Sequence, residues 1–515
     1  MYNQNIIMKN VIHSVLDLGY DGILLDIECQ LSNGLPNIVI VGHVGRPIDE
    51  SKERIRSAFA NNSIHLPRKR ITINIAPADT PKVETSLDLA IVASIMTASK
   101  LVNAPQNPSV FMGEIGLDGS VRPIRGIIGK ILIAKKSKNI LDYYIPRENL
   151  RQAELLEGIN IYPISSIKEL YLHLSGHKLI QKHKGMSSLS QTHPKQNDSY
   201  SYTFEYIAGQ KVAKRGLEIS AAGGHNILLN GPPGTGKSML AKAMISILPN
   251  LTIDESLEVT HLHSLISHDF DDIVTSRPFR SPHHTASNTA IIGGGNYPMP
   301  GEISLSHKGV LFFDELPEFK RSSLEALRQP LEDNMITVTR TKGTATYPAN
   351  FILVATSNPC PCGYYNTHQE CHCSPQQIAK YQQKMSGPIL DRIDIFSNVD
   401  NIEHESLLAG KSTEESSAVI AKRVADARLI QKVRFAKTKT NSEMNNQDIK
   451  DTACLSPSAK SLLDSASKKL HISPRSYMRT IKVARTIADL DQSKSIEPMH
   501  IAESLQFRPK LSHQL

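Results

Sequence analysis

The feature that most constrains this chain is the run from 231 to 238, which reads Gly-Pro-Pro-Gly-Thr-Gly-Lys-Ser. It matches the pattern G-x-x-x-x-G-K-[ST], in which a glycine-rich backbone folds its N–H groups around phosphate oxygens. Residues 226–229 resemble a short buried strand, and residues 239–248 have the apolar period of a helix. This order of elements places a phosphate at a helix N-terminus. The predicted nucleotide-binding residues are Gly231, Pro232, Pro233, Gly234, Thr235, Gly236, Lys237 and Ser238.

A second apolar strand is expected to deliver two carboxylates to the same phosphate. Residues 310–313 are apolar throughout, and Asp314 and Glu315 follow them directly. Because parallel strands present their carboxyl ends at one edge of a sheet, Asp314 and the Ser238 hydroxyl would complete a Mg²⁺ shell. Glu315 would polarise the attacking water. The alternative is an acidic pair on a solvated turn.

A third strand and the lysine of the glycine loop complete the predicted ATP-hydrolysing site. Lys237 would reach the β- and γ-phosphates. Residues 351–356 read as another buried strand, and Asn358 follows it closely enough to position a water molecule near the carboxylates. The expected cofactors are therefore ATP and Mg²⁺.

Composition indicates an ordinary globular protein with several domains. The chain has 515 residues, 40% of them hydrophobic and 21% charged, and a formal net charge of +8. This charge is compatible with a nucleic-acid partner without requiring one. No apolar run is long enough to span a bilayer, and the first residues lack the pattern of a secretion signal. We therefore expect a cytoplasmic protein without a membrane partner.

Changes in pattern along the chain indicate three regions and one linker. The first region shows strand patterns at 37–41 and 71–75 and helical patterns at 49–59 and 87–98, which is typical of an α+β domain. The expected boundaries are 1–175 for this domain, 176–199 for a polar linker, 200–400 for the nucleotide-binding core and 401–515 for a helical C-terminal domain.

Four of the six cysteines fall within fourteen positions, at Cys360, Cys362, Cys371 and Cys373. In a reducing compartment such a cluster favours a metal site over disulfides, and four thiolates can enclose a structural Zn²⁺. Each pair has one intervening residue rather than the commoner two. His368 and His372 are additional possible ligands. The alternative is four free thiols in a loop.

Several motifs resemble those of the AAA+ ATPases. Asn358 occupies a position similar to their sensor 1, and residues 387–394 resemble their arginine-finger region. This resemblance implies that Arg392 reaches the γ-phosphate of a neighbouring subunit, with a local ion pair to Asp391 or Asp394 as the alternative. Ser473-Pro474-Arg475 resembles sensor 2, which would place Arg475 in cis at the nucleotide. Arg479 and Arg485 are competitors for that role.

Longer motifs resemble the Mg-chelatase-like branch of this superfamily, at 209–218, 221–226, 277–284, 300–305 and 327–332. Within that branch, the chain is similar to the ComM (YifB) family. The resemblance implies an α/β P-loop AAA+ core with a helical lid, assembled as a homo-hexamer that hydrolyses ATP while moving on single-stranded or branched DNA. It also implies branch migration during natural transformation, with recombination proteins as further partners.

A basic hairpin at 334–349 would project into the pore of such a ring. Arg340 and Lys342 would then contact DNA phosphates without reading sequence. A solvated hairpin edge carrying charges against aggregation is the alternative. Residues 277–285, with two arginines and two histidines, are a candidate for a second pore loop.

The first 175 residues resemble the protease domain of Lon, of the ribosomal S5 domain 2-like fold, at 81–86 and 113–126. That domain uses a Ser–Lys dyad. Ser86 falls at the nucleophile position, but the lysine position falls at Ile128, and Lys130 lies two residues on. Without an amine beside Ser86 we expect no proteolysis. An ATP-dependent protease and a chelatase-like remodelling ATPase remain the alternative functions.

Overall fold

The computed structural model describes residues 12–82, 84–138, 140–185, 202–267, 273–295, 298–341, 343–367, 369–385, 387–401 and 415–509. The chain divides into two compact units. The first comprises 1–195, 252–274 and 343–346, and the second comprises 196–251, 275–342 and 347–515. Among the described residues, no helix is both long and apolar enough to cross a membrane.

The first unit is built on an eight-stranded mixed sheet with the order β10-β9-β8-β5-β1-β2-β4-β3. Ile71, Ile73 and Ile75 of β4 alternate with more exposed residues, so one face of this strand packs into the core. The strands are β1 (Ile12–Leu18), β2 (Asp21–Ser32), β3 (Asn37–Val41), β4 (Arg70–Ala76), β5 (Ser109–Phe111), β8 (Asp142–Pro146), β9 (Asn160–Ile164) and β10 (His183–Lys184).

The helices of this unit include α1 (Arg46–Asn61), α2 (Asp88–Ala98), α3 (Ile127–Lys138), α4 (Leu150–Ala153) and α5 (Ile167–Leu174). The helix α2 is buried along nearly its whole length, which explains why its residues are apolar on every side. Strand β10, which lies inside the segment expected as a linker, pairs with β9. The linker residues 186–199 lie outside the described residues.

A helix from the middle of the nucleotide-binding sequence also belongs to the first unit. This helix, α8 (Ile253–Ser264), packs on α3. The His261 ring fills the space above Gly129, where a Cβ atom would lie 2.1 Å from it. The same ring lies 4.7 Å from the Tyr20 ring, and its Nε2 atom lies 3.0 Å from the Tyr20 carbonyl oxygen. Helix α8 is therefore an integral part of this unit's packing.

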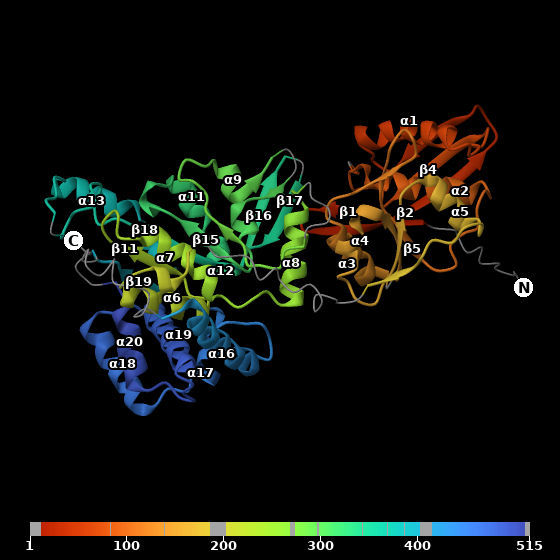
Figure 1. Ribbon diagram of the computed structural model, residues 1–515. Coiled ribbons are helices and arrows are strands. Elements are labelled where there is room, and N and C mark those ends of the chain that lie inside the picture. Colours follow the sequence, from red (N-terminus) through yellow and green to blue (C-terminus); the bar gives the residue numbers. More distant parts are fainter. Residues whose placement is uncertain are drawn as a thin grey trace, which may run out of the picture. The chain divides into compact units, whose positions relative to one another are not determined.

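The second unit contains a five-stranded parallel sheet with the order β12-β15-β18-β11-β19 (Figure 1). Its central strands are almost completely buried, as expected for parallel strands covered on both faces. The carboxyl ends of all five strands therefore lie at one edge. The strands are β11 (Ile227–Asn230), β12 (Phe279–Arg280), β15 (Val310–Phe313), β18 (Ile352–Ser357) and β19 (Ile395–Asn398).

The C-terminal part of this unit is helical, blue in Figure 1, which confirms the expected parallel α/β core with a helical lid. Ile487 and Val424 of the lid share an apolar cluster with Leu229 and Val354 of the sheet. The lid helices are α16 (Ser417–Phe435), α17 (Asn446–Thr452), α18 (Pro457–Lys469), α19 (Pro474–Leu490) and α20 (Pro498–Gln506).

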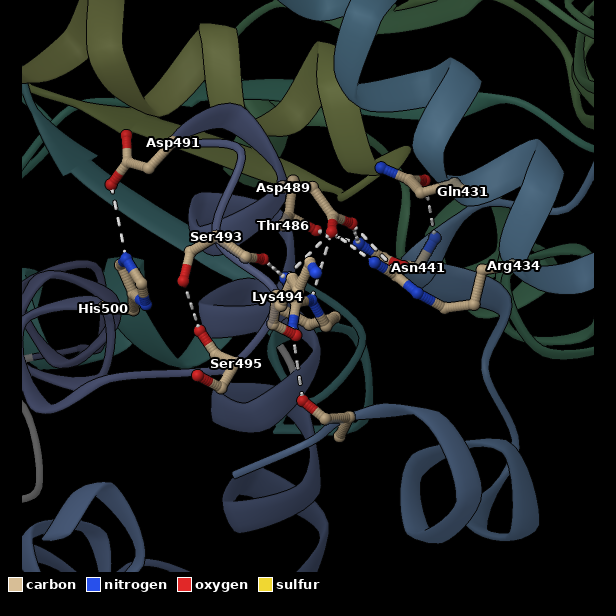
Figure 2. Close-up of polar contacts among 12 residues, drawn as sticks. Gln431, Arg434, Asn441, Thr486, Asp489, Asp491, Ser493, Lys494, Ser495 and His500 are labelled. Carbon is tan, nitrogen blue, oxygen red and sulfur yellow. Dashed lines mark hydrogen bonds and ion pairs between the residues drawn. The ribbon is translucent and has the colours of Figure 1, made fainter. Parts of the chain in front are cut away.

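A buried polar network holds the lid helices together (Figure 2). Asp489 of α19 accepts hydrogen bonds from Arg434 and Asn441, and it forms an ion pair with Arg485. Asn441 also donates to the Thr486 hydroxyl. Because both charges of these pairs are withdrawn from water, the network depends on every partner being present.

Candidate active site

The phosphate loop leaves β11 at Asn230 and enters helix α7 (Lys237–Ala243). Gly234 and Gly236 have positive φ angles of 80° and 87°, a backbone conformation that side chains other than glycine rarely adopt. The sequence therefore needs glycine at these positions to turn the backbone N–H groups into a concave loop before the helix begins.

Lys237 is buried at the centre of this loop, with 8% of the residue exposed. Its ammonium group donates hydrogen bonds of 2.6 Å to the carbonyl oxygens of Gly231 and Pro232. It donates a third, of 3.0 Å, to the Asn358 side-chain oxygen. Burial lowers the pKa of Lys237 from 10.5 to about 8, although Asp314 and Glu315 act in the opposite direction. A multivalent anion would favour the charged amine here.

The two acids lie where β15 ends. The Ser238 hydroxyl lies 3.0 Å from one oxygen of Asp314, and the Thr356 hydroxyl donates a 2.7 Å hydrogen bond to the other. The Glu315 amide donates to the same Thr356 hydroxyl at 2.8 Å. Glu315 itself adopts a left-handed backbone conformation with φ of 56°.

Thr356 is a site residue that the sequence motifs did not predict. It is the next-to-last residue of β18 and is completely buried. It binds the side chain of Asp314 and the backbone of Glu315, so it fixes the direction of both acids. The only available signal was its place one residue before the polar end of an apolar strand.

Lys237, Ser238, Asp314 and Asn358 therefore form one connected group at the carboxyl edge of the parallel sheet. They follow three neighbouring strands along the chain, since β11 pairs with β18 and β18 pairs with β15. This group offers a cation, a hydroxyl, a carboxylate and an amide around one point. Such a set of donors fits a Mg²⁺-bound triphosphate.

Arg392 and Arg475, the two arginines proposed from the resemblance, both contact the carboxylate of Glu332. Arg392 lies 2.6 Å from Glu332, and Arg475 contacts the same carboxylate oxygen. These two guanidinium groups hold the pKa of Glu332 below its usual range. Glu332, near the end of α12 (Arg328–Asp333), closes the motif at 327–332, but the sequence predicted no role for it, because its two arginine partners lie far away along the chain.

The competitors of Arg475 have other partners. Arg479 lies 3.5 Å from Asp394, whose other oxygen lies 3.1 Å from the buried ring of His225. Arg485 is completely buried in the Asp489 network. Asp394 is therefore engaged by groups other than the neighbouring arginine that sequence suggested.

The candidate DNA-contacting residues are partly described. Arg340, at the end of β16 (Met335–Arg340), donates a 2.8 Å hydrogen bond to the Gly293 carbonyl oxygen. Lys342 lies outside the described residues. In the second expected pore loop, Arg277 donates to the carbonyl oxygens of Pro249 and Lys308. Arg277 thus holds backbone segments together.

The four clustered cysteines converge. Their sulfur atoms all lie within 4.8 Å of one another. The Sγ atom of Cys360 lies 3.3 Å from that of Cys362 and 3.7 Å from that of Cys371. His372 is exposed, and His368 lies outside the described residues. The donor set at this point is therefore four sulfur atoms.

In the first unit, Ser86 and Lys130 are linked through a carboxylate. Glu84 accepts hydrogen bonds from the Ser86 hydroxyl at 3.0 Å and from the Lys130 amine at 2.7 Å. Lys130 also lies 2.9 Å from Asp17. Burial alone would lower the pKa of Lys130, but the two carboxylates outweigh it and raise the pKa. Because the raised pKa favours the charged form of the Lys130 amine, this amine is a poor acceptor for the serine proton.

Comparison with known proteins adds the family. The model for magnesium chelatase subunit ChlI matches residues 203–407, and models for further parts of ChlI match 27–149 and 414–508. Competence protein ComM of Haemophilus influenzae is 39% identical over 97% of each chain. YifB of Escherichia coli is 37% identical, again over 97% of each. Lon protease of Buchnera aphidicola is 32% identical over 33% of this chain and 23% of its own. The chain therefore belongs to the ComM and YifB family, whose Mg-chelatase-like AAA+ core implies an ATPase that uses ATP and Mg²⁺.

Proposed function

We propose that this protein is a ring-forming ATPase that acts on DNA, and that it drives branch migration when DNA taken up in natural transformation is recombined. The connected group of Lys237, Ser238, Asp314 and Asn358 carries the ATPase part of the proposal. The DNA part is supported by the similarity, over 97% of the chain, to a relative named as a competence protein. This role would place the protein in the cytoplasm.

In this proposal, the residues of the loop exchange partners when ATP binds. The Lys237 amine would transfer the hydrogen bonds that it now donates to Gly231 and Pro232 to phosphate oxygens. Ser238 and Asp314 would hold Mg²⁺, which neutralises charge on the β- and γ-phosphates. Glu315 would orient and polarise the attacking water, and Asn358 would hold that water in line.

A neighbouring subunit would supply the remaining positive charge. Arg392 and Arg475 already converge on one carboxylate oxygen of Glu332. A carboxylate and a γ-phosphate are both oxyanions that guanidinium groups bind well. We propose that, in the assembled hexamer, Arg392 exchanges Glu332 for the γ-phosphate, while Arg475 contributes from the lid.

The alternative functions have weaker support. A Ser–Lys protease requires a neutral amine next to Ser86, whereas the Lys130 amine is paired with two acids. A chelatase-like remodelling ATPase would use the same nucleotide site, but the full-length relatives include a competence protein. Arg340 and Lys342 remain the proposed DNA contacts, with the Gly293 carbonyl fixing one nitrogen of the Arg340 guanidinium.

We also propose that the cysteine cluster binds a structural Zn²⁺. A Zn–S bond of about 2.3 Å in a tetrahedron separates the sulfur atoms by about 3.8 Å. The sulfur atoms of Cys360 and Cys371 lie 3.7 Å apart, and those of Cys362 and Cys371 lie 3.5 Å apart. Four thiols at this spacing fit a closed tetrahedral site with no position left for a substrate.

The test combines ATPase and branch-migration assays on the purified full chain. We expect single-stranded DNA to stimulate ATP hydrolysis and ATP to drive movement of a four-way junction. Lys237→Ala should abolish both activities, because the loop loses its only ammonium group. Hydrolysis that no polynucleotide stimulates, with no junction movement, would contradict the DNA role while leaving the ATPase intact.

A further inference from the structure

The cysteine cluster contacts the phosphate loop directly. Gly363 follows Cys362 and has a positive φ of 87°. A Cβ atom at Gly363 would lie 2.4 Å from Cδ and 3.0 Å from Cγ of Pro233, in the middle of the loop. Side chains do not tolerate such distances, so glycine is needed here for close approach as well as for its backbone angle.

A second route joins the cluster to the polar side of the same site. Asn358, which accepts a hydrogen bond from the Lys237 amine, lies two residues before Cys360. The carbonyl group of the intervening Pro359 accepts a hydrogen bond from Gln382. The hydroxyl oxygen of the buried Tyr381 also accepts a hydrogen bond from the Asn358 backbone. Helix α13 (Pro375–Lys384) thus holds this segment from the other side.

The chain therefore contacts the nucleotide site both before and after the first cysteine pair, Cys360 and Cys362. Residues 358–360 lead from the Lys237 partner into the cluster, and Gly363 leads from the cluster back to Pro233. A short loop of this kind has few apolar residues to fix its shape. In small metal-bound segments, metal–sulfur bonds fix the shape instead, because the free energy of metal binding stabilises the folded conformation.

We propose that a Zn²⁺ ion in the Cys360, Cys362, Cys371 and Cys373 cluster positions the phosphate loop, so that metal loading controls ATP binding and turnover. This inference rests on the proposed ATPase function and zinc site. Without the ion, the positions of Gly363 and Asn358 are no longer fixed. Pro233 and Lys237, which contact these two residues, are then held less firmly. A misplacement of about 1 Å in such a site costs on the order of 100-fold in rate.

The first experiment uses the full chain with and without its metal. Zinc content is measured on the protein as purified, and zinc is then removed with a thiol-specific mercurial and a chelator. Affinity for a fluorescent ATP analogue is measured in both states, because it does not require hydrolysis. We expect at least a tenfold loss of affinity that added Zn²⁺ reverses. Equal affinity in the two states, or the absence of bound zinc, would overturn the proposal.

Two variants separate the contact from the metal. Gly363→Ala should retain zinc and lose at least tenfold in kcat/KM for ATP, because its Cβ would displace Pro233. Gly176→Ala is the matched control, since Gly176 has a φ of 79° and no atom within 4 Å of its Cβ position. Zinc-loaded Gly363→Ala with wild-type kinetics would rule out the Pro233 contact as the route.

Two cysteine variants test whether the metal itself is needed. Cys362→Ser should lose both zinc and ATP affinity, whereas Cys454→Ser, at an exposed isolated thiol, should lose neither. If the wild-type protein binds zinc and the ATP analogue but hydrolyses no ATP, the proposed ATPase function fails while the metal effect on affinity is still measured. The two proposals are thus tested separately.

Discussion

Removing the Asp489 carboxylate should destabilise the lid far more than removing its neighbour Asp491. The Asp489 side chain is completely buried, and it binds Arg434 and Asn441 (Figure 2). It also forms an ion pair with Arg485. In Asp489→Ala, two guanidinium groups keep their charge but lose their only carboxylate in this network. An unpaired buried charge is among the largest penalties that a single substitution can introduce.

The size of the effect follows from what remains after the substitution. Breaking a buried ion pair by removing one partner costs roughly 3–5 kcal/mol. Arg485 keeps hydrogen bonds to the carbonyl oxygens of Ser493 and Lys494, at 2.6 and 3.0 Å. Arg434 keeps one to Asn441. We therefore expect the lower end, about 3 kcal/mol, which corresponds to a Tm decrease of about 5 °C for a unit as large as the second one.

The measurement is urea and thermal unfolding followed by circular dichroism. Asp491→Ala is the control, because Asp491 is 36% exposed and lies 3.8 Å from Arg215 and 3.4 Å from His500. Exposed pairs of this kind contribute about 1 kcal/mol or less. If the free energies of unfolding of Asp489→Ala and Asp491→Ala differ by less than about 1 kcal/mol, the buried network does not stabilise the lid as proposed.

Three further outcomes are expected. Glu315→Gln should bind ATP and fail to hydrolyse it, so a filter-binding assay should find unhydrolysed ATP on the protein; normal turnover would exclude Glu315 as the group that polarises water. ATP binding should take up a proton above pH 8, because burial holds the pKa of Lys237 near 8 in the empty site and phosphates favour the charged amine. Affinity should therefore fall as pH rises from 8 towards 10.5, and calorimetry in buffers of different ionisation enthalpy checks this; Lys237→Met should show no such uptake. Neither the wild-type chain nor Ser86→Ala should degrade casein with ATP, whereas degradation lost only in Ser86→Ala would contradict the role given to Lys130.

Local patterns were sufficient for the residues at the carboxyl edge of the parallel sheet. The loop from Gly231, the acids after β15 and Asn358 after β18 each follow an apolar strand directly. Parallel strands bring their ends together, so spacing along the chain predicts proximity in space. Thr356 escaped notice because a buried threonine inside a strand looks like any β-branched residue.

Partners that lie far apart in sequence could not be predicted. Arg392 and Arg475 are more than eighty residues apart, and both bind Glu332, which belongs to a third segment. The sequence suggested Asp391 and Asp394 as partners of Arg392 only because they lie within two positions of it. Periodicity gives the apolar face of a helix but not the element that it packs against, which is why the partner of α8 was not foreseen.

The packing of α8 has a consequence for how this gene could be divided. A fragment ending near residue 185 would leave the hollow above Gly129 empty, and a fragment starting near residue 202 would expose the ring of His261 to water. Truncation at the apparent boundary therefore damages both products. A version of the first unit that folds by itself therefore requires residues 252–274 to be joined to the N-terminal fragment.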